Sequence, residues 1–287
     1  MSRNVFFAIQ LWGHEIDRVF KEIEDLGYDA AYYGDGPFDW LLDCYSVLGY
    51  AIALTNRIKL GPAVTYLEGS YRHPVAVMKA LFTLARISKG RFEARLGFIR
   101  NEAEQFWSKY GIRIKDMEER IKNFEEAVKM VREIMEKGKS KAANVEISNF
   151  VPVAKFPICI AAMGKKTIPI ALKYADIWEL SYVTPEKLRE LLDRYKKANI
   201  EISIELDVII AKDHESFRRK YSEYLNMRSS KAEESFRLSA IAGTPDQCIK
   251  KIQQYLDLGI KRFTLAFNEY PAMDGIEVFS REVLPSF

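Results

Sequence analysis

Eight short runs of β type, separated by longer stretches of helical period, constrain the fold of this 287-residue chain more than any other feature. The runs cover residues 5–10, 30–33, 58–64, 92–98, 157–161, 177–180, 202–210 and 263–267. Between the first two runs, apolar residues recur at i, i+3, i+4 and i+7 from Ile16, which is typical of an amphipathic helix. Because the alternation continues without a break in composition, we predict an α/β protein, one closed (β/α)8 barrel forming a single domain over residues 1–287.

Two connections are longer than such a barrel requires. Residues 99–156 carry two expected helices, about 101–108 and 116–137, and residues 211–245 carry a charged helical segment. We therefore expect helical insertions after the fourth and the seventh strands. A doubly wound sheet is the alternative fold, but it typically has fewer strands, and no G-x-G-x-x-G motif follows the first run.

Composition narrows the kind of partner. Lys and Arg number 43 against 40 Asp and Glu, a net charge of +3 that does not indicate nucleic acid or an anionic membrane surface. Three widely separated cysteines, Cys44, Cys159 and Cys248, form no C-x-x-C motif, and the three histidines lack metal-ligand spacing. No segment approaches the ~18–20 apolar residues of a membrane span. We expect a soluble, cytoplasmic protein without a metal, whose partner is a small molecule.

The sequence also resembles a known family. The stretch NRIKLGPAVTYLEGSYRHPVAVMKALFTLARISKGRFEARLGFIRNEAEQF combines R-I-x-L-G, R-H-P and T-L-x-x-I-S-x-G-R, a pattern similar to the bacterial luciferase-like monooxygenases and their coenzyme F420-dependent oxidoreductase relatives. FPICIAAMGKKTIPIALKYADIWEL and IAGTPDQCIKKIQQYLDLGIKRFTL extend the resemblance nearly from end to end. It implies a luciferase-like TIM barrel that holds an isoalloxazine-type cofactor at the carboxyl ends of its strands. It also implies a homodimer and, for a flavin user, a separate flavin or F420 reductase.

The segment IAAMGKKT is the first candidate for contact with this cofactor. In deazaflavin-binding relatives the matching residues lie against the ribityl-phosphate arm, which here implies Ala161, Ala162, Met163 and Gly164. Small side chains allow the backbone to approach a ligand, and N–H groups at a helix start attract anions. Lys165 and Lys166 would add positive charge for the acidic tail of F420. The alternative is a turn with two solvated lysines, although lysine at a helix N-terminus favours an anionic partner.

Three other positions carry implied contacts with the cofactor ring. In many relatives a bulge, often with a cis peptide, presses on the central ring, and here it would lie at Ala63 and Val64, followed by Thr65. Asn101 matches an asparagine that hydrogen-bonds the pyrimidine edge, although it could equally cap the next helix. Asp35 matches an aspartate that contacts the cofactor, or it ends its strand as an Asx-turn.

The catalytic acid is less clear, because two family positions differ. Many relatives carry histidine where this chain has Gly36, and the sugar-phosphate dehydrogenases of the group carry glutamate where it has Phe98. Glucose-6-phosphate oxidation is therefore not expected. We consider Asp35, Glu68 and His14 as replacement catalytic acids, each with the alternative of a solvated loop residue.

Glu93 and Arg95 raise a separate question, because they share one face of the fourth strand. If that face is buried, both charges must be paired. We interpret them as structural ion-pair residues, with possible partners on later strands at Glu179, Glu205 and Asp207.

These observations lead to three hypotheses on function. The first is an oxidoreductase that uses coenzyme F420 for hydride transfer to or from a small organic substrate. The second is an FMN-dependent monooxygenase that uses O₂ and externally reduced flavin. The third, which Gly36 and Phe98 keep open, is a flavin- or deazaflavin-binding protein without catalysis.

Overall fold

The computed structural model describes residues 4–98, 104–142, 145–150, 154–195, 199–226 and 236–287. All eight predicted strands are present: β1 (Phe6–Leu11), β2 (Ala30–Tyr33), β3 (Lys59–Pro62), β5 (Ala94–Gly97), β8 (Ile158–Ala161), β9 (Ile177–Ser181), β10 (Glu201–Ile210) and β12 (Arg262–Phe267). Four short strands supplement them: β4 (Thr65–Tyr66), β6 (Ser140–Ala142), β7 (Val145–Ile147) and β11 (Ile241–Gly243).

Helices separate most of these strands. They are α1 (Val19–Asp25), α2 (Cys44–Leu54), α3 (Pro74–Ile87), α4 (Glu104–Trp107), α5 (Met117–Lys137), α6 (Ile168–Tyr174), α7 (Pro185–Arg194), α8 (His214–Asn226), α10 (Pro245–Leu256) and α11 (Asp274–Glu282), with short 3-10 turns η2 (Ser108–Tyr110) and η3 (Leu284–Ser286). Capping residues mark both ends of the 21-residue helix α5. Asp116 accepts hydrogen bonds from the N–H groups of Glu118 and Glu119, and Gly138 ends the helix at φ +68°.

The chain divides into two compact units. The first unit contains residues 1–11, 17–31 and 179–287, and the second contains residues 12–16 and 32–178. Strands β2 and β9 each contribute residues to both units. Each unit is described below by itself.

In the first unit, β12 pairs in parallel with β1 and with β10, and β11 pairs in parallel with β10. Side chains from these strands form its core, in which Phe7 stacks on Phe263 with 5.4 Å between ring centroids. The buried carboxylate of Glu179 accepts hydrogen bonds from Ser203 (3.0 Å) and Thr264 (2.9 Å). A buried charge needs such donors, so Glu179 has a structural role here.

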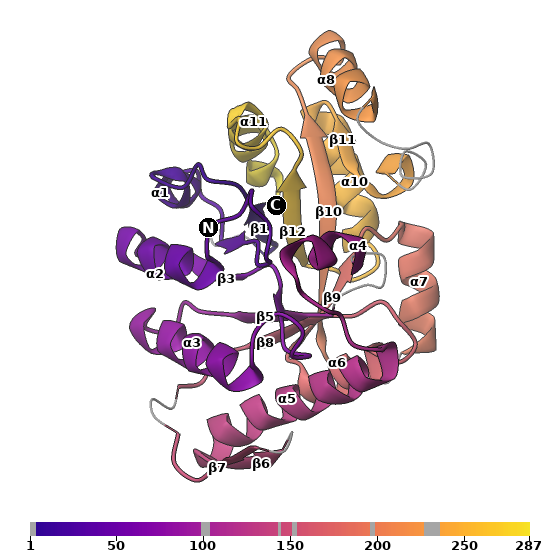
Figure 1. Cartoon of the computed structure of the whole chain (residues 1–287). Coiled ribbons are helices and arrows are strands. Elements are labelled where there is room, and N and C mark those ends of the chain that lie inside the picture. The colour runs from indigo at the N-terminus through magenta and orange to yellow at the C-terminus, as the bar shows by residue number, and fades with distance from the viewer. Residues whose placement is uncertain (1–3, 99–103, 143–144, 151–153, 196–198, 227–235) are drawn as a thin grey trace. The chain divides into compact units, whose positions relative to one another are not determined.

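In the second unit, β5 pairs in parallel with β4 and β8, and Leu60 of β3 forms a bridge to Phe92 just before β5. Every residue of β5 is buried. The approach of β3 to the backbone before β5 explains Gly61, because a Cβ atom there would overlap the carbonyl oxygen of Glu93. Figure 1 shows α2 and α3 beside β3 and β5, and the β6–β7 hairpin against α5.

Glu93 and Arg95 are both buried, as the structural interpretation requires. Glu93 accepts a hydrogen bond from the Tyr32 phenol at 2.6 Å, and it pairs with Lys59 Nζ at 3.1 Å. The guanidinium of Arg95 lies over the Tyr32 ring, 3.9 Å from its centroid. A cation beside Glu93 thus comes from neighbouring β3, whereas the partners expected from the sequence lay on later strands.

All three cysteines are free thiols with fully buried side chains. Cys44 and Cys159 belong to the second unit, and Cys248 to the first. Burial raises the pKa of the Cys44 thiol, and it raises the pKa of Cys248 to about 12. Because the thiolate is the reactive form, a raised pKa lowers the reactivity of Cys44 and Cys248 in the folded protein.

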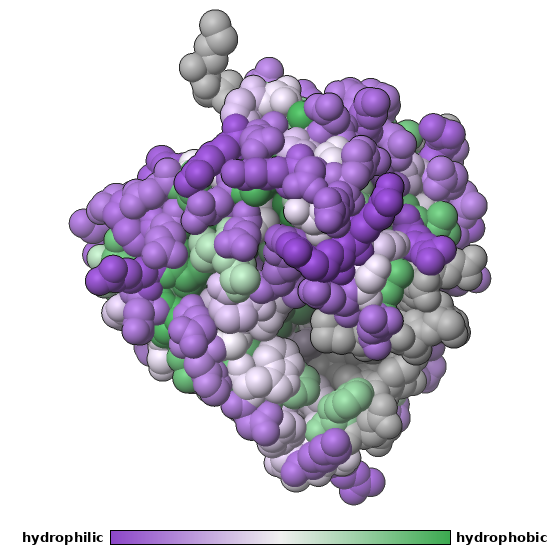
Figure 2. All heavy atoms as spheres, turned by 90° about the horizontal axis from the view of Figure 1, so that it is seen from above, coloured by the Kyte–Doolittle hydropathy of each residue, from purple (hydrophilic) through white to green (hydrophobic). Residues whose placement is uncertain are grey.

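On the face shown in Figure 2, the described residues are mostly hydrophilic, and hydrophobic side chains reach the surface in separate groups. No helix within the described ranges combines the length and the apolar character needed to cross a membrane.

Candidate functional site

The best-defined polar cluster of the second unit forms around Asp35, just after β2. Its side chain is buried, with 1% of its surface exposed. One carboxylate oxygen accepts a hydrogen bond from the hydroxyl of Thr65, the first residue of β4, at 2.5 Å. The other oxygen pairs with the guanidinium of Arg72. Asp35 and Thr65, two separate candidates in the sequence, are thus in direct contact.

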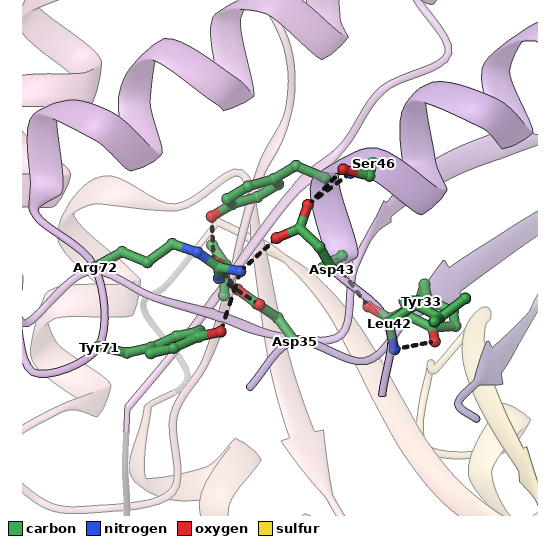
Figure 3. Close-up of polar contacts among 10 residues, drawn as sticks. Tyr33, Asp35, Leu42, Asp43, Ser46, Tyr71 and Arg72 are labelled. Carbon is green, nitrogen blue, oxygen red and sulfur yellow. Dashed lines mark hydrogen bonds and ion pairs between the residues drawn. The ribbon is translucent and has the colours of Figure 1, made fainter. Parts of the chain in front are cut away.

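Arg72 joins two loops of this unit. One terminal nitrogen contacts Asp35, and the other donates to Asp43, the N-cap residue of α2, at 2.9 Å. Figure 3 shows the guanidinium between these two carboxylates, with Tyr71 alongside. The cation also lies 4.2 Å from the ring centroid of Tyr71 and 4.7 Å from that of Tyr45. The planar guanidinium is thus held by charge and by aromatic faces together.

The environment changes the acidity of these groups. Burial raises the pKa of the Asp35 carboxyl, and Arg72 and Thr65 only partly oppose that change. Burial acts to lower the pKa of the Arg72 guanidinium, but the charge and hydrogen bond of Asp35 have the larger effect, so the pKa of Arg72 is raised. Asp43 is also partly desolvated, yet hydrogen bonds from Ser46 and the charge of Arg72 lower its pKa. A buried carboxyl with a raised pKa exchanges protons closer to neutral pH than an exposed aspartate does.

A phenol extends the cluster. The Tyr45 hydroxyl lies 2.6 Å from the Thr65 hydroxyl oxygen. Since Thr65 donates its proton to Asp35, the Tyr45 hydroxyl must be the donor in this second bond. Burial, with the charge of Asp35, raises the pKa of Tyr45, so the phenol remains protonated.

Arg72, Asp43 and Tyr45 were not among the site residues predicted from the sequence. The available signal was the R-H-P motif, because a charged residue just before a helix in a predicted strand-to-helix loop can reach a neighbouring loop. Asp43 was detectable as an N-cap, since its carboxylate accepts from the N–H of Ser46 at 2.9 Å.

The other two candidate acids lie apart from this network. Glu68 is fully buried between β4 and α3, and its backbone carbonyl accepts from the side chain of Asn123 at 3.4 Å. His14 is exposed, with Nε2 3.2 Å from the carbonyl oxygen of Asp39. Neither residue is among the contacts of Asp35, so the structure groups only one of the three acids with Thr65.

Phe98, which stands where some relatives carry glutamate, has an aromatic packing role. Its ring lies beneath the guanidinium of Arg120, 5.0 Å from its centroid, and packs edge-on against Phe124 of α5 at 6.1 Å. This contact with α5 gives the position a structural use in place of an acidic one.

The bulge implied after β3 is present. The Ala63–Val64 peptide bond is cis, and it separates β3 from β4. The N–H of Ala63 donates to the carbonyl of Tyr33 at 2.7 Å, which ties the bulge to the end of β2. Gly97 of β5 faces it so closely that a Cβ atom there would overlap the Val64 side chain.

The segment after β8 is exposed from Met163 to Lys166, whereas Ala161 is half-buried and Ala162 is buried. Its turn already uses several N–H groups: Gly164 donates to the Thr167 hydroxyl, and Thr167 and Ile168 donate to the Gly164 carbonyl. Fewer N–H groups therefore remain for an anion than the sequence suggested, and the contribution of the lysines becomes more important.

The two lysines differ in their surroundings. Lys166 Nζ lies 2.8 Å from a carboxylate oxygen of Glu118 on α5, and both side chains are exposed. Lys165 is exposed, and it forms no ion pair with any residue that the structure describes. Asn101, the remaining ring-contact candidate, lies outside the described residues. The cofactor contacts of all these positions stay predictions.

Two further features bear on whether a polar organic cofactor fits. The Ser70 hydroxyl oxygen is buried and has no hydrogen-bond partner within the described part of the chain. It lies two residues before Arg72, where an oxygen of a bound molecule would satisfy it. Across the described ranges, no three His, Cys, Asp or Glu side chains cluster as metal ligands do. The Ser70 hydroxyl is thus available to hydrogen-bond a polar organic group.

Aromatic side chains border the same cluster. The Trp107 ring packs edge-on against Tyr66 (5.2 Å), Tyr71 (5.6 Å) and Phe38 (6.4 Å), and Phe38 stacks on Trp40 at 5.0 Å. They come from the loop after β2, from β4 and the loop that follows it, and from α4, which follows β5. Flat apolar side chains beside a polar cluster are typical of sites for organic ligands.

Comparison with known proteins gives the family. The family model described as luciferase-like monooxygenase matches residues 12–262. A search of curated protein sequences finds no match to the chain.

Solved structures match along the whole chain. An F420-dependent secondary alcohol dehydrogenase in complex with an F420–acetone adduct is 16% identical, with a TM-score of 0.78 over 97% of this chain and 98% of that one. The coenzyme F420-dependent tetrahydromethanopterin reductase from Methanopyrus kandleri is 19% identical, with a TM-score of 0.78 over 99% of both chains.

A third similar structure is a monooxygenase. The EDTA monooxygenase from Chelativorans sp. BNC1 is 14% identical, with a TM-score of 0.76 over 99% of this chain and 93% of that one. At such identities the likeness shows the fold alone, and it confirms the predicted α/β fold of the luciferase-like TIM-barrel type. With its match to the family model over residues 12–262, the chain belongs to the luciferase-like monooxygenase family, whose members are oxidoreductases and monooxygenases.

Proposed function

We propose that this protein is an oxidoreductase that uses coenzyme F420 for hydride transfer to or from a small organic substrate. The observation that carries the choice of cofactor is the pair of consecutive exposed lysines, Lys165 and Lys166, directly after β8. The acidic tail of F420 would find two ammonium groups there. Two structures of similar fold, the secondary alcohol dehydrogenase and the tetrahydromethanopterin reductase, are F420-dependent.

The bound deazaflavin would supply the hydride chemistry. The protein would supply the remaining functions. Asp35, buried and with a raised pKa, would hold or release the proton that accompanies hydride transfer, while Arg72 fixes its carboxylate. The unsatisfied hydroxyl of Ser70 would donate to an oxygen of the bound molecule. The aromatic rings around Trp107 would exclude water from one side.

The existing ion pair between Lys166 and Glu118 does not prevent Lys166 from binding the acidic tail of F420. Lys166 and Glu118 are 63% and 82% exposed, and ion pairs at such exposure contribute little to stability. Exchange of Glu118 for an anionic ligand is therefore easy. Glu118 would act as a competitor for Lys166, so its removal should strengthen binding of an acidic tail.

Equilibrium binding to the purified protein tests the proposal. The double variant Lys165→Ala/Lys166→Ala should bind F420 more weakly than the wild type, with a larger effect at low salt, and FMN much less so. Glu118→Gln should bind F420 more tightly. Lys173→Ala is the matched control, because Lys173 of α6, the helix that follows the two lysines, forms an exposed pair with Glu125 of α5 at 3.0 Å.

Two binding results would contradict the proposal. If F420 passes through an ultrafiltration membrane while FMN is retained at micromolar affinity, the choice of F420 is wrong. If the double lysine variant binds F420 with an unchanged dissociation constant, the lysines do not hold its tail.

An FMN-dependent monooxygenase is the second candidate. The observation that favours it is that Glu118 already engages Lys166, which leaves Lys165 alone to meet an anion. One such charge suits the single phosphate of FMN better than a longer acidic tail. This function would need reduced flavin from a separate reductase, and consumption of O₂ with added reduced FMN would identify it.

A further inference from the structure

The proton on Asp35 needs a route. The Asp35 side chain is 1% exposed, and its two oxygens are occupied by Arg72 and by the hydroxyl of Thr65. The guanidinium of Arg72 does not release a proton, because its pKa is raised above an already high value. Within the described part of the chain, Thr65 is therefore the one partner of Asp35 that can pass a proton to it.

Thr65 is itself connected to a phenol. Its hydroxyl oxygen lies 2.6 Å from the hydroxyl of Tyr45 on α2. Asp35 and Thr65 are both buried, whereas Tyr45 is half-buried. The three groups thus form a continuous hydrogen-bonded chain that ends at a half-buried residue.

We propose that Thr65 and Tyr45 form a proton relay that loads and unloads Asp35. This inference rests on the proposed function in giving Asp35 a proton to exchange. To protonate the carboxylate, the Thr65 O–H bond breaks as an Asp35 O–H bond forms. The Tyr45 O–H bond breaks as Thr65 is reprotonated, and water returns a proton to Tyr45. The net change is one proton moved from solvent to Asp35, and the reverse sequence returns it.

The surroundings require these transfers to be concerted. A free Tyr45 phenolate is unfavourable, since burial raises its pKa, so the proton from water must arrive as the phenol gives up its own. The other titratable or charged groups that act on Asp35 or Tyr45 are Arg72, Asp43, Cys44 and Tyr71. Arg72 is the cation among them, and it lies over the Tyr45 ring, where it favours transient negative charge.

Infrared spectroscopy of the cofactor-free protein can test the relay. The carbonyl stretch of protonated Asp35 is assigned by its loss in Asp35→Asn. After a pH jump, the growth or decay of this band gives the rate of proton exchange, and its amplitude against pH gives the titration midpoint. Neither quantity depends on turnover.

Three variants give different expected results. Tyr45→Phe should slow exchange on the order of tenfold or more, with little change of the midpoint, because the phenol does not contact Asp35. Thr65→Val should slow exchange and also raise the midpoint, since it removes a donor to the carboxylate. Thr65→Ser keeps the hydroxyl and should restore both values toward the wild type.

Exchange at the wild-type rate in Tyr45→Phe would overturn the relay. Should that variant fail to fold by circular dichroism, the comparison of Thr65→Val with Thr65→Ser decides, and equal rates would overturn it. The proposed function fails separately: slowed exchange in a protein that binds neither F420 nor FMN would retain the relay and refute the oxidoreductase. Normal cofactor binding together with an unchanged rate of proton exchange in the variants would refute the relay and leave the proposed oxidoreductase function standing.

Discussion

Replacement of Arg72 by methionine should destabilise the protein in a strongly pH-dependent way. Methionine keeps much of the apolar stem between the Tyr45 and Tyr71 rings but removes the charge. The buried Asp35 carboxylate then retains the Thr65 hydroxyl as its donor and loses its cation. Asp43 also loses its pair with Arg72, but it is 52% exposed and remains bonded to Ser46, so its contribution is small.

The size of the effect has an upper limit. Loss of one partner of a buried ion pair costs about 3–5 kcal/mol. A carboxylate that is too costly to bury takes up a proton instead. The free-energy cost of this protonation is about 1.36 kcal/mol for each pH unit above the unfolded pKa of ~3.9, which is about 4 kcal/mol at pH 7. Because the Arg72 side chain is 18% exposed, water recovers part of this cost. We expect a loss of about 3 kcal/mol at pH 7.

The sign of the pH dependence follows from the direction of the pKa shift. The pKa of Asp35 is raised in the folded protein, and removal of Arg72 raises it further. The folded state then binds the proton more tightly than the unfolded chain. The destabilisation is therefore absent below the unfolded pKa and grows as the pH rises toward the folded one. At pH 5 the same limit is about 1.5 kcal/mol.

Urea unfolding of the wild type and the variant at pH 5, 6 and 7 measures this loss. Arg281→Met is the matched control, since Arg281 forms an exposed pair with Glu277 at 2.9 Å, and it should cost little at any pH. The double variant Asp35→Asn/Arg72→Met should lose most of the pH dependence. An equal loss at pH 5 and pH 7 in Arg72→Met would refute the reasoning, because the cost would then not arise from the charge on Asp35.

Three further outcomes are expected from unfolding measurements. Gly97→Ala should cost about 1–3 kcal/mol through overlap with Val64, and adding Val64→Ala should recover part of it; simple additivity of the two losses would contradict the contact. Lys59→Met should destabilise the protein by about 1–3 kcal/mol, since the side chain of Glu93 is 1% exposed and would lose this cation; a loss no larger than that of an exposed ion pair would argue against the pair. Asp116→Ala should cost about 1 kcal/mol as a lost N-cap, with Asp116→Asn close to wild type; equal losses in both would rule out capping.

The strands could be predicted from the sequence because their signal is local. A run such as residues 263–267 is mostly apolar and bounded by helical patterns, so neither its type nor its place depends on distant partners. The same holds for the N-cap at Asp116. The cis bond at Ala63–Val64 was not readable from residue properties and came from the family resemblance.

The candidate site depended on distant contacts, which the sequence could not supply. Asp35 and Arg72 are 37 residues apart, and Arg72 could have met any carboxylate of the neighbouring loops. Lys166 was interpreted as a ligand for anions because no pattern points to Glu118, 48 residues away on α5. Side-chain partners across a fold are set by packing, whereas secondary structure is set largely by neighbours in the chain.

The three buried thiols can report local opening of the protein, because each reacts only when the structure around it opens. A pulse of an aromatic disulfide reagent would modify Cys44 and Cys159 when the second unit opens and Cys248 when the first unit opens. Mass spectrometry of the labelled peptides would then show which of the two units opens more often, with no engineered probe. A ligand that occupies the Asp35 cluster should protect Cys44, at the start of α2 beside Asp43, before it protects Cys248.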